Sequence, residues 1–181
     1  MNLIISVCKE RILELEFVKP VEKIVGKNYF VKNYKEVTSE DSKKAKKVII
    51  CGTSLEDFEY LKNLEKFSWI KDFEKPILGI CAGMQIIGLI FGSELIFEEY
   101  IGTHFETFNL EFSSKFFSEG ETVQEVYYLH KKAISLPEGF TKLNESLSYP
   151  IAFKHNTKEV YGVLFHPEVL NSELIKEFVK N

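Results

Sequence analysis

The chain has 181 residues, of which 45% are hydrophobic and 28% are charged. This composition is typical of a globular protein with one sizeable core, and we expect a single domain over residues 1–181. The formal net charge of −4 argues against nucleic acid as a partner, because phosphate binding needs a basic face.

The sequence contains no signal for a membrane or for an oxidising compartment. No apolar stretch approaches the roughly 18 residues of a membrane span, and the apolar start at residues 1–8 lacks the basic segment of a signal peptide. The three cysteines, Cys8, Cys51 and Cys81, have neither paired nor metal-binding spacing. We therefore expect a cytoplasmic protein with no membrane contact, no metal and no cofactor.

Three apolar runs in the first fifty residues predict buried parallel strands. They lie at residues 2–8, 29–34 and 47–52 and have the length and the continuous hydrophobicity of such strands. The third run is expected to lead into a helical stretch over residues 55–73 that is interrupted near Asn63.

The segments between these strands are more ambiguous. Residues 12–18 alternate apolar and polar side chains, which suggests a strand. Pro20 and Gly26 would then begin and end a short helix. Residues 38–47 are polar and charged, and we expect a solvated surface connection there.

The centre of the chain has a cysteine at a strand–turn–helix junction. The apolar strand 77–80 leads through a Gly-x-Cys-x-Gly turn, centred on Cys81, into an apolar helix that reaches Gly92. This pattern is typical of a nucleophile elbow, with cysteine in the place of serine. The glycines at 79 and 83 would let the backbone bend and pack closely, and the helix N-terminus would favour the thiolate. The alternative is a buried cysteine in an ordinary connection.

The next part of the chain predicts a patch of antiparallel strands between about residues 95 and 155. Strands are expected at 93–97, 105–112 and 123–129, and residues 105–112 alternate apolar and polar side chains, as in an antiparallel strand with one solvated face. Residues 98–104 should form a polar loop that leaves its histidine on the surface.

A second motif near the C-terminus supplies a base. The apolar strand 160–165 ends at His166, and Glu168 follows two residues later. A cysteine nucleophile needs a base within hydrogen-bond reach and a third group that orients the base. His166 and Glu168 would serve Cys81 in these two roles. A final amphipathic helix is expected from about residue 172.

The two motifs together resemble those of the class I glutamine amidotransferases, over nearly the whole chain. Within that family the sequence looks like the separate glutaminase subunit of GMP synthetase, on residues 76–81, 136–140 and 161–169. Apolar strands alternating with helices, and an elbow at a strand end, imply an open doubly wound α/β fold. Its mostly parallel sheet, flavodoxin-like and amidotransferase-like, would carry the antiparallel patch.

The resemblance implies that the substrate is glutamine. Cys81 would attack the side-chain amide and form a thioester, His166 would transfer protons, and Glu168 would orient the imidazole. The oxyanion would be held by the Ala82 amide and the Gly52–Thr53 loop, and glutamine would be bound by Gln85 and His130. The alternative for Gln85 is a structural residue whose amide is satisfied inside the protein.

Two loops depart from the family pattern. Members usually have two glycines and a proline where this chain has Gly52-Thr53-Ser54. They usually have Ser-His-x-Asp where it has Leu129-His130-Lys131-Lys132. A lysine in place of the acid would disfavour a substrate ammonium group. Either glutamine is held differently, or the substrate is not free glutamine, or the two lysines point to solvent.

Three functions are therefore considered. The first is a glutaminase that passes ammonia to a separate synthetase subunit, since no synthetase domain fits in this chain. The second is a γ-glutamyl hydrolase or another cysteine hydrolase on the same triad. The third is a non-catalytic regulatory module on the same scaffold.

Overall fold

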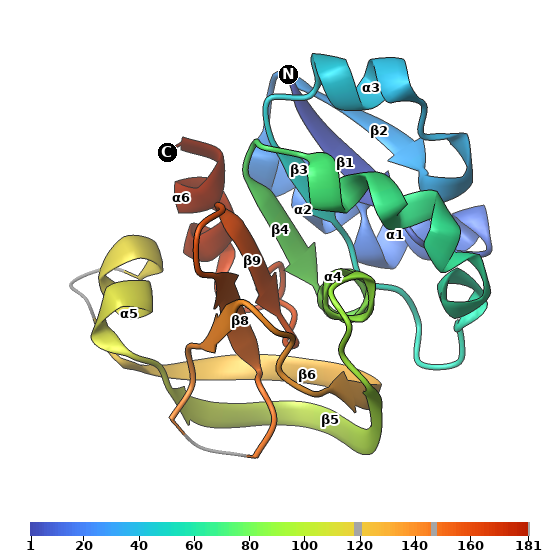
Figure 1. Cartoon of the computed structure of the whole chain (residues 1–181). Helices are drawn as coiled ribbons and strands as arrows, with labels where there is room; N and C mark the ends of the chain where they lie inside the picture. The colour runs from blue at the N-terminus through green and yellow to red at the C-terminus, as the bar shows by residue number, and fades with distance from the viewer. Residues whose placement is uncertain (118–120, 146–147, 181) are drawn as a thin grey trace.

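The fold is built around one mixed sheet. The computed structural model describes residues 1–117, 121–145 and 148–180, and within them seven strands lie side by side in this sheet. Five strands are parallel, and two more are added at one edge by antiparallel pairing (Figure 1). In spatial order they are β2 (Tyr29–Asn33), β1 (Asn2–Ser6), β3 (Val48–Ile50), β4 (Ile77–Ile80), β9 (Val160–Val163), β8 (Ala152–His155) and β7 (Phe140–Lys142).

Helices cover both faces of this sheet. Helices α2 and α6 pack against each other on one face, and α4 packs with η3 on the other (Figure 1). This arrangement is the open, doubly wound, mostly parallel α/β sheet that the sequence predicts. The helices are η1 (Arg11–Leu13), α1 (Glu14–Phe17), α2 (Lys19–Val25), η2 (Tyr34–Glu36), α3 (Ser39–Lys44), η3 (Glu59–Asp72), α4 (Ala82–Ile90), α5 (Leu110–Phe116) and α6 (Ser172–Lys180).

The central strands are apolar along their length because both of their faces are covered. All residues of β1, β3, β4 and β9 are buried. In parallel strands the carboxyl ends meet at one edge of the sheet, and the connections that follow them line a common crevice. Gly52 follows β3, Cys81 follows β4 and His166 follows β9, so the topology brings three distant segments to one edge.

A long two-stranded ribbon stands apart from the main sheet. Its strands are β5 (Leu95–Thr107) and β6 (Val123–Ile134), which pair antiparallel below the sheet in Figure 1. The antiparallel patch is thus confirmed, but the polar loop expected at 98–104 is wrong. Pairing with β6 carries β5 through this segment, with an irregularity between Phe97 and Tyr100.

The strand expected at 105–112 is also wrong in its second half. Strand β5 ends at Thr107, and α5 begins at Leu110. The side chain of Asn109 accepts a hydrogen bond from the backbone of Phe112 at 2.9 Å, as an N-cap does. The cap therefore redirects a segment whose apolar and polar residues alternate.

One segment near the N-terminus differs from the expectation. Residues 12–18 are helical in η1 and α1, with Leu15 62% exposed and Phe17 buried. The solvated connection expected at residues 38–47 is confirmed, and it contains the exposed helix α3, which Thr38 and Asp41 start with a reciprocal capping box. The helix that Pro20 and Gly26 bound is confirmed as α2.

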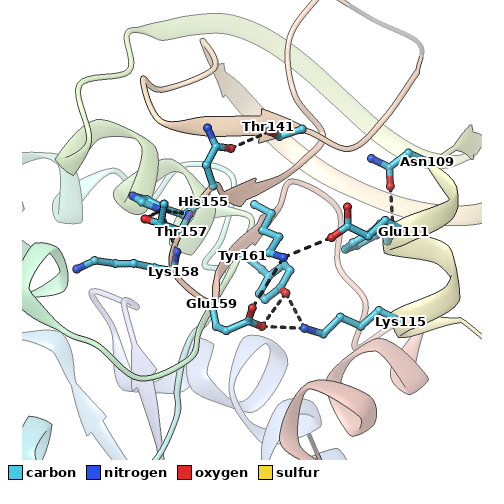
Figure 2. Close-up of polar contacts among 12 residues, drawn as sticks. Asn109, Glu111, Lys115, Thr141, His155, Thr157, Lys158, Glu159 and Tyr161 are labelled. Carbon is cyan, nitrogen blue, oxygen red and sulfur yellow. Dashed lines mark hydrogen bonds and ion pairs between the residues drawn. The ribbon is translucent and has the colours of Figure 1, made fainter.

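Helix α5 is held against the sheet by a polar network at β9, shown in Figure 2. The Lys115 ammonium donates to Tyr161 Oη at 2.6 Å and to Glu159 Oε2 at 2.8 Å. Lys154 reaches Glu111 at 3.4 Å and Glu159 at 3.8 Å. These contacts join α5, β8 and the start of β9, so α5 is fixed to the main sheet.

Candidate active site

The backbone bends sharply at Cys81, between β4 and α4. Cys81 has φ 49° and ψ −104°, a conformation that residues with a side chain rarely adopt. Such a residue typically costs about 1–3 kcal/mol and persists where the surroundings enforce it. The bend therefore lies at the cysteine itself, not at the neighbouring glycines, and it presents the side chain at the N-terminus of α4 as a nucleophile elbow does.

The two flanking glycines are needed for close packing. A Cβ at Gly79 would lie 2.5 Å from the carbonyl carbon of Gly83, and one at Gly83 would lie 2.2 Å from the carbonyl oxygen of Ile50. Real Cβ contacts are not this short, so side chains at these positions would force α4 away from β3 and β4. The glycines thus hold the helix start against the sheet.

The imidazole of His166 is buried and paired with a carboxylate. Its Nδ1 lies 2.7 Å from Oε1 of Glu168, and both side chains are 2% exposed. The backbone amide of His166 donates to the carbonyl of Tyr127 at 2.8 Å, and the ring of Phe17 packs 5.8 Å away. Strand β6 and helix α1 therefore hold the histidine in place.

Cys81 and His166 come together beside Gly52. A Cβ built at Gly52 would lie 2.8 Å from Cε1 of His166 and 3.4 Å from Cβ of Cys81. The Cys81 thiol is directed to the carbonyl of Leu129, with Sγ 3.6 Å from the oxygen. The Nε2 atom of His166 is buried without a hydrogen-bond partner among the described residues.

Electrostatics around His166 favour its charged form. Burial alone would lower the pKa of the imidazole, but the carboxylate of Glu168 and the sulfur of Cys81 outweigh it and hold the pKa of His166 well above its usual value. An imidazolium next to a thiol stabilises the thiolate, which is the nucleophilic form of cysteine. The arrangement can therefore support an ion pair between the two residues.

The loop after β3 is anchored beside the cysteine. Gly52 and Thr53 are buried, and Asp57 fixes the loop by accepting hydrogen bonds from the Thr53 hydroxyl at 2.7 Å and from the Lys9 amide at 2.7 Å. On the other side, Ala82 opens α4, where the first backbone amides have no acceptor within the helix. The residues expected to form an oxyanion hole thus flank Cys81 from two directions.

A narrow pocket opens onto Cys81. Its free space is about 10 Å³, which is room for roughly one water molecule. The side chain of glutamine needs more room than this. The residues that line the pocket are Thr53, Ser54, Leu55, Asp57, Phe58, Tyr60, Cys81, Ala82, Gln85, Leu129, His130 and Lys131.

Gln85 lies in this pocket and is held by two hydrogen bonds. Its amide oxygen accepts from the Tyr60 hydroxyl at 2.5 Å, and its amide nitrogen donates to the carbonyl of Lys132 at 2.9 Å. Its side chain is thus oriented by η3 on one side and by β6 on the other. Burial, with the nearby Cys81 and Asp57, raises the pKa of Tyr60, which keeps the hydroxyl protonated as a donor.

His130 is a buried residue of the ribbon strand β6 and lines the pocket. Its Nδ1 lies 2.9 Å from the carbonyl of Glu98. Burial lowers the pKa of His130 to about 4, so the ring is neutral at pH 7. The structure thus places a neutral imidazole in the pocket wall.

The two lysines of the altered loop lie in different surroundings. Lys131 lines the pocket, and its ammonium forms an ion pair with Glu56 of the opposite wall. The ammonium of Lys132 lies 4.7 Å from the ring centre of Phe58 and 5.7 Å from that of Phe97. Both side chains therefore have partners in the protein, contrary to the alternative that they simply point to solvent.

The sequence did not indicate three contributors to this site. They are the hydroxyl of Tyr60, the carboxylate of Asp57 and the carbonyl of Leu129. Tyr60 falls in a stretch of η3 whose apolar residues look like core positions, and a backbone carbonyl leaves no sequence signal.

Among the described residues, no group of three or more histidine, cysteine or acidic side chains could hold a metal ion. No helix within the same residues has both the length and the hydrophobicity to cross a membrane. The cysteines at 8, 51 and 81 are all free and buried.

A cysteine at an elbow, next to a buried imidazole–carboxylate pair on an open α/β sheet, is the arrangement of a cysteine-dependent hydrolase. Comparison with known proteins identifies the class further. The family model for glutamine amidotransferase class-I matches residues 19–181. The chain belongs to the class I glutamine amidotransferases, and it is thus a cysteine-dependent amide hydrolase.

Individual relatives agree with this assignment. The glutamine-hydrolysing GMP synthase subunit of Methanocaldococcus jannaschii is 35% identical over 147 residues, which are 78% of this chain and 74% of that one. Its counterpart from Methanobrevibacter smithii is 37% identical over 56% of this chain and 54% of its own. The glutamine-hydrolysing GMP synthase of a Streptococcus pyogenes strain is 38% identical, but the match spans 22% of its length.

Solved structures confirm the fold. A candidate GMP synthase subunit from Thermoplasma acidophilum has a TM-score of 0.78 at 23% identity, over 99% of this chain and 93% of that one. A glutamine amidotransferase from Thermotoga maritima has a TM-score of 0.68 at 17% identity, over 99% and 90% of the two chains. Of the three functions considered from the sequence, the family and its relatives support the glutamine amidotransferase.

Proposed function

We propose that this chain is the glutamine-hydrolysing subunit of a two-chain synthetase of the GMP synthase type. In this proposal Cys81 is the nucleophile, His166 is the general acid and base, and Glu168 orients the imidazole. One observation carries these roles: the buried His166–Glu168 pair, at 2.7 Å, lies next to a strained cysteine at a helix N-terminus.

The first half of the reaction forms a thioester. The thiolate of Cys81 attacks the amide carbon of the glutamine side chain, and the amide oxygen takes up negative charge. Amides of Ala82 and of the Gly52–Thr53 loop stabilise that charge. The tetrahedral intermediate collapses as His166 gives its proton to the departing nitrogen, which leaves as ammonia.

The second half releases glutamate. Neutral His166 takes a proton from a water molecule, and the resulting hydroxide attacks the thioester carbon. The second tetrahedral intermediate breaks its carbon–sulfur bond, which returns Cys81 as the thiolate beside the imidazolium. Glu168 stays ionised throughout and keeps Nδ1 of the ring protonated.

Substrate binding in this proposal uses Gln85 and His130. Both line the pocket. The Nδ1–H of neutral His130 donates to the carbonyl of Glu98, so its Nε2 is able to accept one hydrogen bond. Because the pocket has room for about one water molecule, the 53–58 loop and the start of η3 must move away from β6 when glutamine enters. Binding is therefore coupled to opening of this wall.

The proposal also says which chain receives the ammonia. Relatives named as one subunit of a glutamine-hydrolysing GMP synthase support transfer to a separate synthetase chain. The three free cysteines suit the reducing conditions of a cytoplasm, where we place the reaction.

The test is ammonia release from glutamine, measured on the purified chain with and without a synthetase subunit from the same genome. We expect glutamine-dependent ammonia release that rises when the partner is added, and its loss in Cys81→Ala. Turnover of glutamine that persists in Cys81→Ala would exclude the proposed nucleophile. Stronger cleavage of γ-glutamyl peptides than of glutamine would favour the second function instead.

A further inference from the structure

We propose that Lys131 binds the α-carboxylate of the substrate, and that Glu56 occupies this position in the closed pocket as an internal substitute. This inference rests on the proposed function and extends it to substrate recognition. It assigns a specificity role to Lys131, which differs in charge from its neighbours in the pocket wall.

The position of Lys131 is the first observation. Lys131 belongs to β6 and lines the same pocket as Cys81. Its ammonium forms an ion pair with the carboxylate of Glu56, which follows Leu55 of the opposite wall. The Lys131 side chain is 25% exposed, whereas that of Glu56 is 75% exposed. The lysine is thus part of the pocket, and its partner comes from the surface.

The charges of the pocket are the second observation. Besides Cys81, three residues that line it have side chains able to carry charge near neutral pH: Asp57, His130 and Lys131. The carboxylate of Asp57 already accepts hydrogen bonds from the Thr53 hydroxyl and from two backbone amides, and His130 is neutral because burial lowers its pKa to about 4. Lys131 is therefore the cation of this pocket.

The chemistry of the substrate matches this arrangement. Glutamine has the reacting amide at one end and a carboxylate at the other, so a pocket with the nucleophile at its base needs a cationic group near its mouth. Lys131 and Cys81 supply these two groups in one pocket. A carboxylate is already bound there, and it belongs to Glu56.

Replacing the carboxylate of Glu56 by that of the substrate costs little free energy. An ion pair with a largely exposed partner contributes about 0–1 kcal/mol, so Glu56 is readily displaced. Glu56 also lies on the wall that has to move for glutamine to enter. Arrival of the substrate carboxylate at Lys131 therefore replaces one of the contacts between the two walls, which couples recognition to opening.

Lys132 provides a matched control. It follows Lys131 in β6, where successive side chains point to opposite faces of a strand. Its ammonium lies over the rings of Phe58 and Phe97 and does not line the pocket. Lys132→Met removes the same charge from the neighbouring position.

The experiment measures the rate at which Cys81 is alkylated, so it needs no synthetase partner. Three reagents are compared by mass spectrometry: the diazoketone analogue of glutamine, its counterpart without the α-carboxylate, and iodoacetamide. The chains are the natural protein, Lys131→Met, Glu56→Gln and Lys132→Met. Each rate is taken in the range where it rises with reagent concentration.

We expect Lys131→Met to slow labelling by the carboxylate-bearing diazoketone about 10- to 100-fold, which is typical for loss of a hydrogen bond between charged groups. Labelling by the other two reagents should not slow in this variant. Glu56→Gln should accelerate labelling by the carboxylate-bearing reagent a few-fold, because the internal competitor is gone. Lys132→Met should keep the ratio of the two diazoketone rates that the natural protein has, because its ammonium does not line the pocket.

Two results would overturn the inference. Equal slowing of both diazoketones in Lys131→Met would mean that Lys131 only shapes the pocket. Unchanged labelling by the carboxylate-bearing reagent would mean that Lys131 does not contact the carboxylate. If the natural protein reacts with iodoacetamide but with neither diazoketone, the proposed glutaminase function fails as well, so the two failures are distinguishable.

Discussion

Gly52 and the imidazole of His166 are in such close contact that no side chain fits between them. A Cβ at Gly52 would lie 2.8 Å from Cε1 of His166, closer than real Cβ atoms approach another atom. The backbone after β3 thus packs against the ring, and the ring of Phe17 lies 5.8 Å from it. The contact explains why a glycine is needed at this position.

Gly52→Ala should reduce activity far more than it reduces stability. The added methyl group would push the imidazole away from Cys81, and a displacement of about 1 Å at a catalytic group can cost about 100-fold in rate. Overpacking should lower the free energy of unfolding by about 1–3 kcal/mol. The measurements are glutamine turnover and urea unfolding at the same temperature.

Gly162→Ala is the control for Gly52→Ala. Its Cβ would meet the ring of Phe153 at 2.6 Å and Met84 at 2.7 Å, and does not contact His166. We expect a similar loss of unfolding free energy. Glutamine turnover should be largely retained under conditions in which the protein is still folded. Equal loss of turnover in both variants would show that the Gly52 effect is general destabilisation.

Glu168→Gln should shift the reactivity of Cys81 to higher pH. Glu168 is a main reason why the pKa of His166 is raised in spite of burial. Without its charge, burial prevails and the pKa of His166 falls, so the imidazolium no longer stabilises the thiolate at neutral pH. We expect the midpoint of iodoacetamide labelling at Cys81 to rise, and turnover at pH 7 to fall by about 100-fold or more. An unchanged labelling profile would show that the carboxylate has no electrostatic role.

The central sheet and the elbow could be predicted from the sequence because their signals are local and strong. Apolar strands that are buried on both faces read as continuous hydrophobic runs, and the Gly-x-Cys-x-Gly turn needs small residues at fixed positions. The strands at residues 2–8, 29–34 and 47–52 are confirmed to within a few residues. The break in the 55–73 stretch is also confirmed, at Asn63, although the helix begins only at Glu59.

Elements that depend on partners far along the chain were harder to predict. Residues 98–104 look like a polar loop, yet β6 pairs with them and makes one strand from Leu95 to Thr107. Residues 12–18 alternate as a strand would, but no neighbouring strand among the described residues pairs with them, and local helical hydrogen bonds form instead. Alternation describes which side chains face a core and does not by itself decide between a strand and a short helix.

The site was predictable in its residue types but not in its side-chain partners. The structure brings Cys81, His166, Glu168 and Gly52 together because they follow strands of one parallel sheet. The hydrogen bond from Tyr60 to Gln85 joins η3 to α4, and no sequence pattern connects two residues that meet only through packing of the helices.

Tyr60→Phe should lower both stability and substrate affinity. The variant leaves the buried amide oxygen of Gln85 without the hydroxyl that donates to it at 2.5 Å, and an unsatisfied buried acceptor costs about 1–3 kcal/mol. Gln85 also loses one of the two contacts that orient it in the pocket, so the KM for glutamine should rise more than kcat falls. Tyr100→Phe serves as control, since Tyr100 is 38% exposed and its hydroxyl makes one long contact, at 3.4 Å, with the carbonyl of Thr103. A fall in kcat alone would contradict a positioning role for Tyr60.

Lys115→Met should loosen helix α5 without affecting turnover. Figure 2 shows the ammonium of Lys115 in contact with Glu159 and Tyr161, and its removal leaves Glu159, among the described residues, with only the longer ion pair to Lys154, at 3.8 Å. Because these groups are partly exposed, we expect a loss of about 1 kcal/mol. Faster hydrogen exchange of the α5 amides would report the change, and exposed Lys62→Met is the control.

The contribution of this network should also depend on pH. Burial would raise the pKa of Glu159, but Lys115 and Tyr161 reverse that effect and lower it below the usual value. A carboxylate with a lowered pKa in the folded state stabilises the protein above its unfolded pKa, about 4.5, and loses that contribution as the pH falls through the lowered value. The difference in unfolding free energy between the natural protein and Lys115→Met should therefore shrink below about pH 4.5. A difference that stays constant with pH would mean that Lys115 contributes through packing alone.

Replacement of Cys81 should separate backbone strain from catalysis. Both Cys81→Ala and Cys81→Gly remove the thiol and should abolish glutamine turnover. The two variants differ in backbone strain at residue 81. Glycine adopts φ 49° and ψ −104° without strain, whereas alanine retains the strain. That relief is about 1–3 kcal/mol, and it exceeds the roughly 0.8 kcal/mol that burial of the alanine methyl provides. We expect Cys81→Gly to be more stable to urea than Cys81→Ala by about 1 kcal/mol. Equal stability of the two variants would show that the elbow is not strained, and that its geometry costs the fold nothing.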